Sequence, residues 1–236
     1  MTSLPAEHIL EIRAGDIPIG TLICTPDRLD ELATGWAFAQ GLQVTASTHI
    51  DITSENMGRH PRRQSTGFFF LARSGQRVRH RHATELSRRQ STPHATMGRN
   101  AFKRQVKIVF DLFRDERGAG GYHHAALMGE DAARCLIRDS SRHNAIDKAV
   151  GHALRQGMDI SASAIVLSGK ITTGIAPKTA RSGFPIVATR SLPTAQAVAF
   201  AEAVRLMLAC RILNRRHAIY GPNRLSSIVT GQDTLR

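Results

Sequence analysis

Apolar and polar residues alternate along most of the first 24 positions of the chain. In HILEIRAGDIPIGTLIC the alternation runs on both sides of Gly15-Asp16, which is typical of a β-hairpin. The period then changes to about 3.6 residues in TPDRLDELATGWAFAQGL, which predicts a helix capped by Thr25 or Asp27 and stopped by Gly41. A second pair of strands is expected in GFFFLARSGQRVRH.

An amphipathic helix is predicted within AFKRQVKIVFDLFRDERG. Its apolar residues recur at helical spacing: Phe102, Val106, Val109, Phe110 and Phe113. From GGYHHAALMG onward strands and helices alternate. The predicted order is a hairpin with EDAARCLIRD, helix 141–156, strand 163–168, helix 172–182, strand 185–189, helix 193–206 and strands near 207–212 and 217–220. Such alternation indicates an α/β domain with helices packed on a sheet.

These elements predict one compact unit with two regions. Residues 1–100 are expected to hold the N-terminal hairpin, a helix and a basic strand-and-loop region, and residues 101–236 the α/β core. Arg and His are concentrated between 57 and 100, among few apolar residues. This basic segment is interpreted either as solvated loops and strand edges or as a segment that closes over an anion.

The composition changes this picture by adding a strong positive charge. The 236 residues carry a formal net charge of +13, which favours an anionic partner such as nucleic acid, a nucleotide, a phosphorylated cofactor or an acidic protein. One Trp and two Tyr offer few platforms for stacked bases, which weakens the case for single-stranded nucleic acid. Three scattered cysteines predict neither a zinc site nor a disulfide framework. No window has about 20 consecutive apolar residues, so we expect a cytoplasmic protein without a membrane partner.

The segment RDSSRHNAIDKAVGHALRQG contains the first candidate for a site. Ser140 or Ser141 is a good N-cap for its helix, and Gly157 can end that helix in the left-handed conformation. Arg142 and His143 then fall in the first turn, where the helix dipole disfavours cations. An anion bound at the helix N-terminus would explain both residues.

Two other segments carry candidate chemistry at strand ends. His123 and His124 are adjacent on a strand and therefore point to opposite faces, so they cannot share a metal ion. Either one is a core and one a surface histidine, or one faces a pocket beside the glycine turn Gly120-Gly121. Ser168-Gly169-Lys170 follows a strand and is a candidate phosphate contact, although the P-loop spacing is missing. Lys178 is expected to be exposed. No nucleophile elbow, zinc-protease motif or zinc-deaminase signature appears.

Several of these segments together resemble a known family. The following segments occur in the order and spacing of the formate dehydrogenase accessory protein family, FdhD/NarQ: GGYHHAAL, RDSSRHNAIDKAVGHAL, IVLSGK with KTARSGFPIVATRSLPTAQAVAFAEA, and AIYGPNRL. CTPDRLDELATGWAFAQGL is similar to the family's opening helix. The resemblance covers most of residues 8 to 226 and is most specific at 142–148. It implies a three-layer α/β domain similar to cytidine deaminases but without zinc, and a role in the maturation of molybdenum enzymes such as formate dehydrogenase.

The resemblance also implies a cofactor and partners. Family members bind bis(molybdopterin guanine dinucleotide), which GDP can mimic. They pass sulfur from a cysteine desulfurase to the molybdenum through a persulfide on a C-G-x-C-G loop. The expected partners are the molybdenum enzyme, a desulfurase if sulfur transfer is retained, and a second copy of the chain in a homodimer. The cofactor-binding residues expected here are Gly120, Gly121, His123, Asp139, Arg142, His143, Ser168, Gly169, Lys170, Cys210, Arg211, Ile212, Leu213, Asn214 and Arg215.

The chain departs from the family pattern at the sulfur-carrying loop. It reads M-G-R-N-A where the family has C-G-x-C-G, so the two cysteine positions fall on Met97 and Asn100. A thioether has no ionisable thiol and cannot hold a persulfide. Sulfur transfer is therefore either lost or moved to Cys135 or Cys210, although free cysteines are more often small buried hydrophobes.

Two further functions stay open at this stage. One is a basic nucleic-acid-binding module that uses residues 57–104, which would lose affinity steeply with salt. The other is a non-catalytic assembly factor that docks onto an acidic partner protein.

Overall fold

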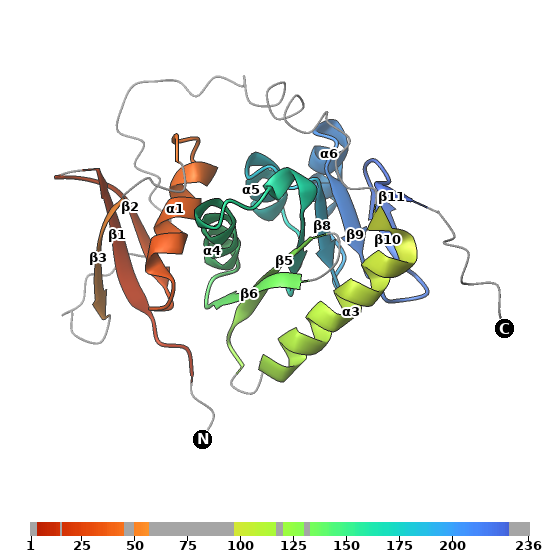
Figure 1. The fold of residues 1–236 in the computed structure, drawn as a ribbon, viewed down its shortest axis with the longest axis horizontal. Coiled ribbons are helices and arrows are strands. Elements are labelled where there is room, and N and C mark those ends of the chain that lie inside the picture. The colour runs from red at the N-terminus through yellow and green to blue at the C-terminus, as the bar shows by residue number, and fades with distance from the viewer. Residues whose placement is uncertain are drawn as a thin grey trace.

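The computed structural model describes residues 4–14, 16–44, 50–56, 97–116, 120–129 and 133–226. Its centre is a six-stranded mixed sheet with the order β10-β9-β8-β7-β5-β6 (Figure 1). The strands are β5 (His123–Met128), β6 (Ala133–Asp139), β7 (Ala164–Leu167), β8 (Ile186–Thr189), β9 (Met207–Cys210) and β10 (Ala218–Tyr220). β7, β8 and β9 are parallel, while β5 runs antiparallel to both β6 and β7 and β10 runs antiparallel to β9.

Helices cover both faces of this sheet, which gives three layers (Figure 1). α4 (Arg142–Arg155), α5 (Ile175–Arg181) and α6 (Ala195–Ala203) pack on one face, and α3 (Arg99–Asp115) packs on the other. Within β7, Ile165 and Leu167 join the first core while Ala164 and Val166 join the second, as strand alternation requires. The predicted α/β class is confirmed, and the likeness to cytidine deaminases stays a prediction.

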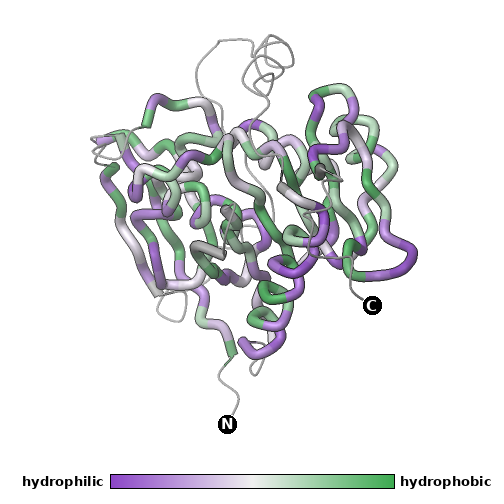
Figure 2. The backbone as a smooth tube through the Cα atoms, turned by 45° about the vertical axis from the view of Figure 1, so that its right-hand side comes forward, coloured by the Kyte–Doolittle hydropathy of each residue, from purple (hydrophilic) through white to green (hydrophobic). Residues whose placement is uncertain are grey.

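The predicted elements of the core are found with small shifts at their ends. The predicted helices 172–182 and 193–206 are shorter in the structure, as α5 and α6, and a short 3-10 helix (Ile160–Ala162) precedes β7. All five apolar residues predicted for the buried face of α3 are buried. Figure 2 shows hydrophobic residues along the central strands and a mixture of hydrophilic and hydrophobic residues along α3.

A smaller sheet holds the N-terminal part of the chain. β1 (His8–Ala14), β2 (Ile17–Cys24) and β3 (Asp51–Asn56) form it in the order β2-β1-β3, so the predicted hairpin is confirmed. α1 (Leu29–Ala39) follows, and Gly41 comes after it with a φ of 86°. The predicted cap by Thr25 or Asp27 is wrong: Arg28 precedes the helix without a side-chain capping bond, because both predicted caps bond to a buried lysine instead.

α1 lies directly on α4 and thereby connects the N-terminal sheet to the core. A Cβ added to Gly35 would lie 1.8 Å from the Asp147 carbonyl oxygen, and one added to Gly151 would lie 1.8 Å from the Glu31 carbonyl oxygen. The two helix backbones therefore touch without intervening side chains. The predicted division of the chain at residue 100 stays a prediction.

The region before α3 is described only at its end. β4 (Met97–Gly98) pairs in parallel with β11 (Leu225–Ser226). The predicted strands of GFFFLARSGQRVRH, and the basic segment up to residue 96, lie outside the described residues.

Candidate functional site

The strand directions bring most of the predicted site segments to one edge of the central sheet. The carboxyl ends of β6, β7, β8 and β9 and the amino end of β5 lie on that edge. The residues aligned along this edge are therefore Asp139–His143, His123, Ser168–Lys170 and Cys210–Arg211. Because neighbouring strands are about 4.8 Å apart, the distance from β6 to β9 is about 19 Å.

Cationic and imidazole side chains gather where β5, β7 and α4 meet. A cavity of about 10 Å³ lies there, and its lining includes Arg142, Ser168, Gly169 and Lys170. It has room for about one water molecule, so a larger anion could lie only at its mouth. A Cβ added to Gly169 would lie 3.7 Å from His123 Nδ1, which places this ring beside the cavity.

The two imidazoles at this edge are held in the neutral form. Burial, Lys178, Arg142 and His123 together lower the pKa of His143 to about 4. Burial and Arg142 lower the pKa of His123, although Asp139 opposes the change. Like charges that disfavour protonation would be offset by a bound anion, so this edge is electrostatically suited to accept one.

The adjacent histidines occupy different environments, as predicted. His124 is buried, and its ring lies 5.2 Å from that of Phe113 in α3. His123 is only half-buried, on the α4 side of the sheet. His124 packs in the core and also lines the small cavity, whereas His123 lies beside Gly169 at the same edge.

Asp139 is fully buried and all its bonds are made within the protein. Oδ2 accepts hydrogen bonds from the Thr25 amide and hydroxyl, both at 3.1 Å, and pairs with Lys148 at 2.8 Å. Oδ1 accepts from the Ser141 amide at 2.8 Å and from Asn144 at 3.2 Å. Ser141 is the N-cap residue of α4, and its side chain makes no capping bond, while its own amide donates to Asp139. Asp139 thus fixes the start of α4, and its predicted cofactor contact stays untested.

Two lysines below the site are buried, which sequence reasoning missed. The ammonium of Lys148 lies 2.7 Å from Thr25 Oγ1 and 3.2 Å from Asp27 Oδ1, with the side chain fully buried. The prediction that Lys178 is exposed is wrong: only 7% of it is exposed, and its ammonium pairs with both oxygens of buried Asp147. The available signal was the charged pair Asp147-Lys148 inside a predicted helix that is otherwise largely apolar on its buried side.

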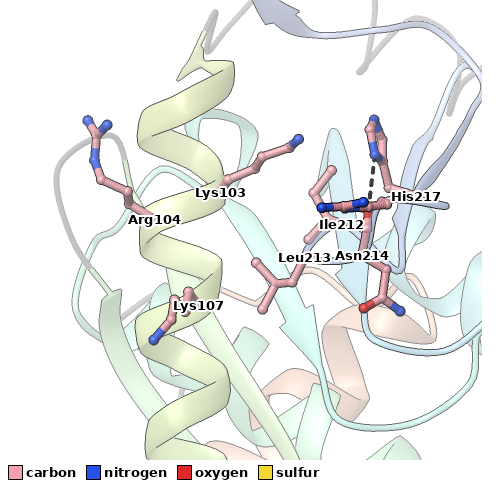
Figure 3. A pocket seen from close by; sticks show the side chains of 8 residues that line it. Lys103, Arg104, Lys107, Ile212, Leu213, Asn214 and His217 are labelled. Carbon is pink, nitrogen blue, oxygen red and sulfur yellow. Dashed lines mark hydrogen bonds between the residues drawn. The ribbon is translucent and has the colours of Figure 1, made fainter. Parts of the chain in front are cut away.

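A groove with cationic lining residues lies on the other face of the sheet, between α3 and the loop after β9 (Figure 3). This groove has a volume of about 470 Å³. Its lining residues are Lys103, Arg104, Lys107, Ile212, Leu213, Asn214, Arg215 and His217. None of them lines the small cavity near Arg142, so Arg215 is not brought into one pocket with Arg142 and Lys170.

The predicted dinucleotide segment 210–215 is divided by this geometry. Cys210 is fully buried in the core, whereas Ile212 to Arg215 line the groove. Lys107 was missed as a site residue, and Lys103 and Arg104 fell only within the alternative of a nucleic-acid-binding module at 57–104, although the positions of all three on the polar face of the predicted helix were a visible signal. Gly120 and Gly121 are both exposed and have positive φ angles just before β5.

All three cysteines are wholly or partly buried. Burial raises the pKa of Cys24 and of Cys210 to about 12, and it also raises the pKa of half-buried Cys135. Thiolates are therefore disfavoured at neutral pH, and the prediction that Cys210 is a buried hydrophobe is confirmed. Asn100, at the family's second cysteine position, is exposed in the first turn of α3.

The described ranges lack two features, a membrane-spanning helix and a cluster of metal-binding side chains. No helix within them is long and apolar enough to cross a membrane. The same ranges contain no group of three or more His, Cys, Asp and Glu side chains that could hold a metal ion.

The chain is a three-layer α/β domain, a class of protein in which ligands commonly bind outside the carboxyl ends of the strands. The model of the FdhD/NarQ family matches residues 5–226, and the chain belongs to this family. The protein "Sulfur carrier protein FdhD" of Shouchella clausii is 26% identical over 91% of this chain and 86% of its own length. Its Bacillus subtilis namesake is 27% identical over 85% and 81%.

A shorter stretch is more similar, and a solved structure shows the same fold. The "Sulfur carrier protein FdhD" of Thermoplasma acidophilum is 40% identical over 45% of this chain and 38% of its own length. The crystal structure of a putative formate dehydrogenase accessory protein from Desulfotalea psychrophila superposes with a TM-score of 0.69. It is 22% identical and covers 94% of this chain and 90% of its own.

Proposed function

We propose that the chain assists the maturation of a molybdenum enzyme such as formate dehydrogenase by holding the bis(molybdopterin guanine dinucleotide) cofactor. The observation that carries this proposal is the gathering of Arg142, His143, His123 and Lys170 at one sheet edge, where Arg142 and Lys170 have no ion-pair partner among the described residues. Family membership and the names of the relatives support the maturation role.

The donor set at this edge fits the phosphates of a dinucleotide. Arg142 offers a planar guanidinium fork and Lys170 a mobile ammonium, both of which bind phosphate oxygens well. The first amides of α4 point toward the same place. Burial and the neighbouring cations keep His143 neutral by lowering its pKa, and a phosphate at the cavity mouth would offset the effect of the cations, so binding should be accompanied by proton uptake at this ring.

GDP is expected to bind the protein at micromolar concentration and low salt, as measured by isothermal titration calorimetry. Arg142→Gln should weaken binding by about tenfold, because it removes a charge-assisted contact. Arg155→Gln is the matched control: it removes the same charge from the exposed last turn of the same helix and should leave the affinity unchanged. A wild-type protein without measurable GDP binding would refute the proposal.

Sulfate provides a second measurement at this edge, since its charge stays constant over the relevant pH range. The free pKa of His143 is about 4, and a nearby anion raises it. The bound state therefore holds more protons, and affinity should rise as the pH falls from about 7 toward 5. Affinity that is flat or falls over this range contradicts proton uptake at the site.

We further propose that the chain does not carry sulfur by the family's route. After incubation with a cysteine desulfurase and radiolabelled cysteine, we expect no label on Cys24, Cys135 or Cys210, because their thiolates are disfavoured. Asn100→Cys should gain label, since position 100 is exposed at a helix N-terminus that lowers a thiol pKa. There the thiolate attacks the terminal sulfur of the desulfurase persulfide and releases the desulfurase thiolate. Mass spectrometry that finds a persulfide on a native cysteine contradicts this part of the proposal.

A further inference from the structure

We propose that the outer edge of β2 binds an extended, basic and apolar segment of another protein, which adds to the N-terminal sheet as a further strand. The sheet has the order β2-β1-β3, so β2 pairs with β1 on one side and with no other strand of the described residues. The edge of a strand presents amide and carbonyl groups that can pair with a second chain. This sheet lies at the end of the molecule away from β10 and β11 (Figure 1), and the inference goes beyond the proposed function.

The outer face of β2 carries a stripe of exposed isoleucines. Leu22 and Cys24 pack against the small core beneath α1, so the residues between them point outward. The outward residues of β2 are Ile17, Ile19, Thr21 and Ile23. The three isoleucines expose 67%, 37% and 45% of their surface, and Ile9 of β1 lies beside Ile23. Apolar side chains gathered in this way are typical of an interaction surface.

The part of this edge that is open to pairing is residues 19–22. At one end Pro18 has no amide hydrogen to donate. At the other end the Ile23 carbonyl already accepts a hydrogen bond of 2.7 Å from the Asn144 side chain. Because the open stretch is short, the side chains and charges beside it must select the partner.

The N-terminal sheet is acidic, although the whole chain has a formal net charge of +13. Residues 7–24 and 50–56 hold five acidic residues and one arginine, a formal charge of −4. The acidic residues are Glu7, Glu11, Asp16, Asp51 and Glu55. The arginine, Arg13, is already paired with Glu11. A strand added to β2 would lie about 10 Å from β1, which is about one Debye length at 0.1 M salt, so these charges favour a basic segment.

Two other occupants fit this surface less well. A nucleic acid would bring phosphates to an acidic sheet, whereas nucleic-acid binding depends on cations. A second copy of the same edge would place two acidic sheets side by side, which like-charge repulsion disfavours. A basic segment with alternating apolar residues meets both the charge of the sheet and the isoleucine stripe.

The test titrates the full chain with a fluorescently labelled peptide of alternating lysine and valine residues and follows its anisotropy. Ile19→Lys should weaken binding by about tenfold, because a lysine on a strand edge blocks pairing and repels the basic peptide. Ile108→Lys is the matched control: it introduces the same charge at an isoleucine of α3 that is 56% exposed, and should change the affinity less than about twofold. Both replaced side chains are exposed, so both variants should fold as the wild type does.

Hydrogen exchange tests whether the peptide binds as a strand. Bound peptide should slow the exchange of amides within residues 19–22 and leave those of α3 unchanged. A peptide methylated at alternate backbone nitrogens keeps its side chains but loses donors, and should bind about tenfold more weakly. Unchanged exchange in β2, or equal affinity of the methylated peptide, overturns strand addition.

The remaining outcomes concern the chemistry of the partner. A wild type that binds no lysine–valine peptide, or that binds a glutamate–valine peptide equally well, overturns the proposal. Equal losses in Ile19→Lys and Ile108→Lys also overturn it, because they show a general effect of charge. If sedimentation finds a dimer that only Ile19→Lys dissociates, the edge binds a second copy instead. GDP binding should be the same in the wild type and Ile19→Lys, so a failure here leaves the proposed function standing.

Discussion

Lys148→Met is expected to lower the free energy of unfolding by about 3–5 kcal/mol, because it leaves the Asp139 carboxylate buried without its counter-charge. Both side chains are fully buried and their charged atoms lie 2.8 Å apart. Thr25 would at the same time lose the ammonium donor to its hydroxyl oxygen. Urea unfolding followed by circular dichroism measures the change.

Two further variants test whether the loss of stability comes from the buried ion pair. Lys107→Met breaks an ion pair of the same 2.8 Å length, but that lysine is 68% exposed, so the loss should stay below about 1 kcal/mol. Adding Asp139→Asn to Lys148→Met should recover part of the stability, since the neutral amide keeps an acceptor oxygen but removes the unpaired charge. A Lys148→Met variant as stable as Lys107→Met would show that this pair does not stabilise the fold.

Under the proposed function the same pair also matters for binding, because Asp139 accepts a hydrogen bond from the amide of Ser141, the N-cap residue of α4, and so holds the turn that carries Arg142 and His143. Lys148 is thus a positioning residue for the candidate site. In the folded fraction of Lys148→Met, GDP should bind more weakly than in the wild type.

Gly151→Ala is expected to destabilise the protein by about 3 kcal/mol or more, because the new methyl group overlaps the Glu31 carbonyl oxygen. The sign is informative, since Gly→Ala inside a helix ordinarily stabilises by about 1 kcal/mol. Here the gain in helix propensity is outweighed, because α1 and α4 must move apart. Thermal unfolding of the purified variant measures the effect.

Gly35→Ala tests the other side of the same contact and should give a similar loss, because its methyl group meets the Asp147 carbonyl oxygen. Gly98→Ala is the matched control: nothing lies within 4 Å of its added Cβ, and its φ of −56° suits any residue. If Gly151→Ala unfolds at the temperature of Gly98→Ala, the two helices are not in direct backbone contact.

The candidate site was partly accessible from sequence. The placement of Arg142 and His143 in a first helical turn follows from a cap and a 3.6-residue period, both of which are local signals. Ser168-Gly169-Lys170 follows a buried strand as predicted. Their shared edge could be expected only once strand order and direction were known, because sequence periodicity does not say which strands are neighbours.

The groove between α3 and the loop 212–217 could likewise be predicted from the sequence only in part. Lys103 was visible as a basic residue on the polar face of α3, but nothing local indicated that this face lies opposite the loop 212–217. More than 100 residues separate the two walls, so only the packing of α3 on the sheet brings them together.

The sequence by itself determined the periodic elements: the N-terminal hairpin, the buried stripe of α3 and the alternating strands and helices of the core. Each depends on contacts within a few residues or on one repeating apolar face. The tertiary structure alone decided how the charged groups are paired. Lys148 bonds to Thr25, 123 positions away in the sequence, and Lys178 bonds to Asp147, 31 positions away. The burial and pairing of these charges therefore depend on long-range packing, which the local periodicity of apolar residues does not reveal.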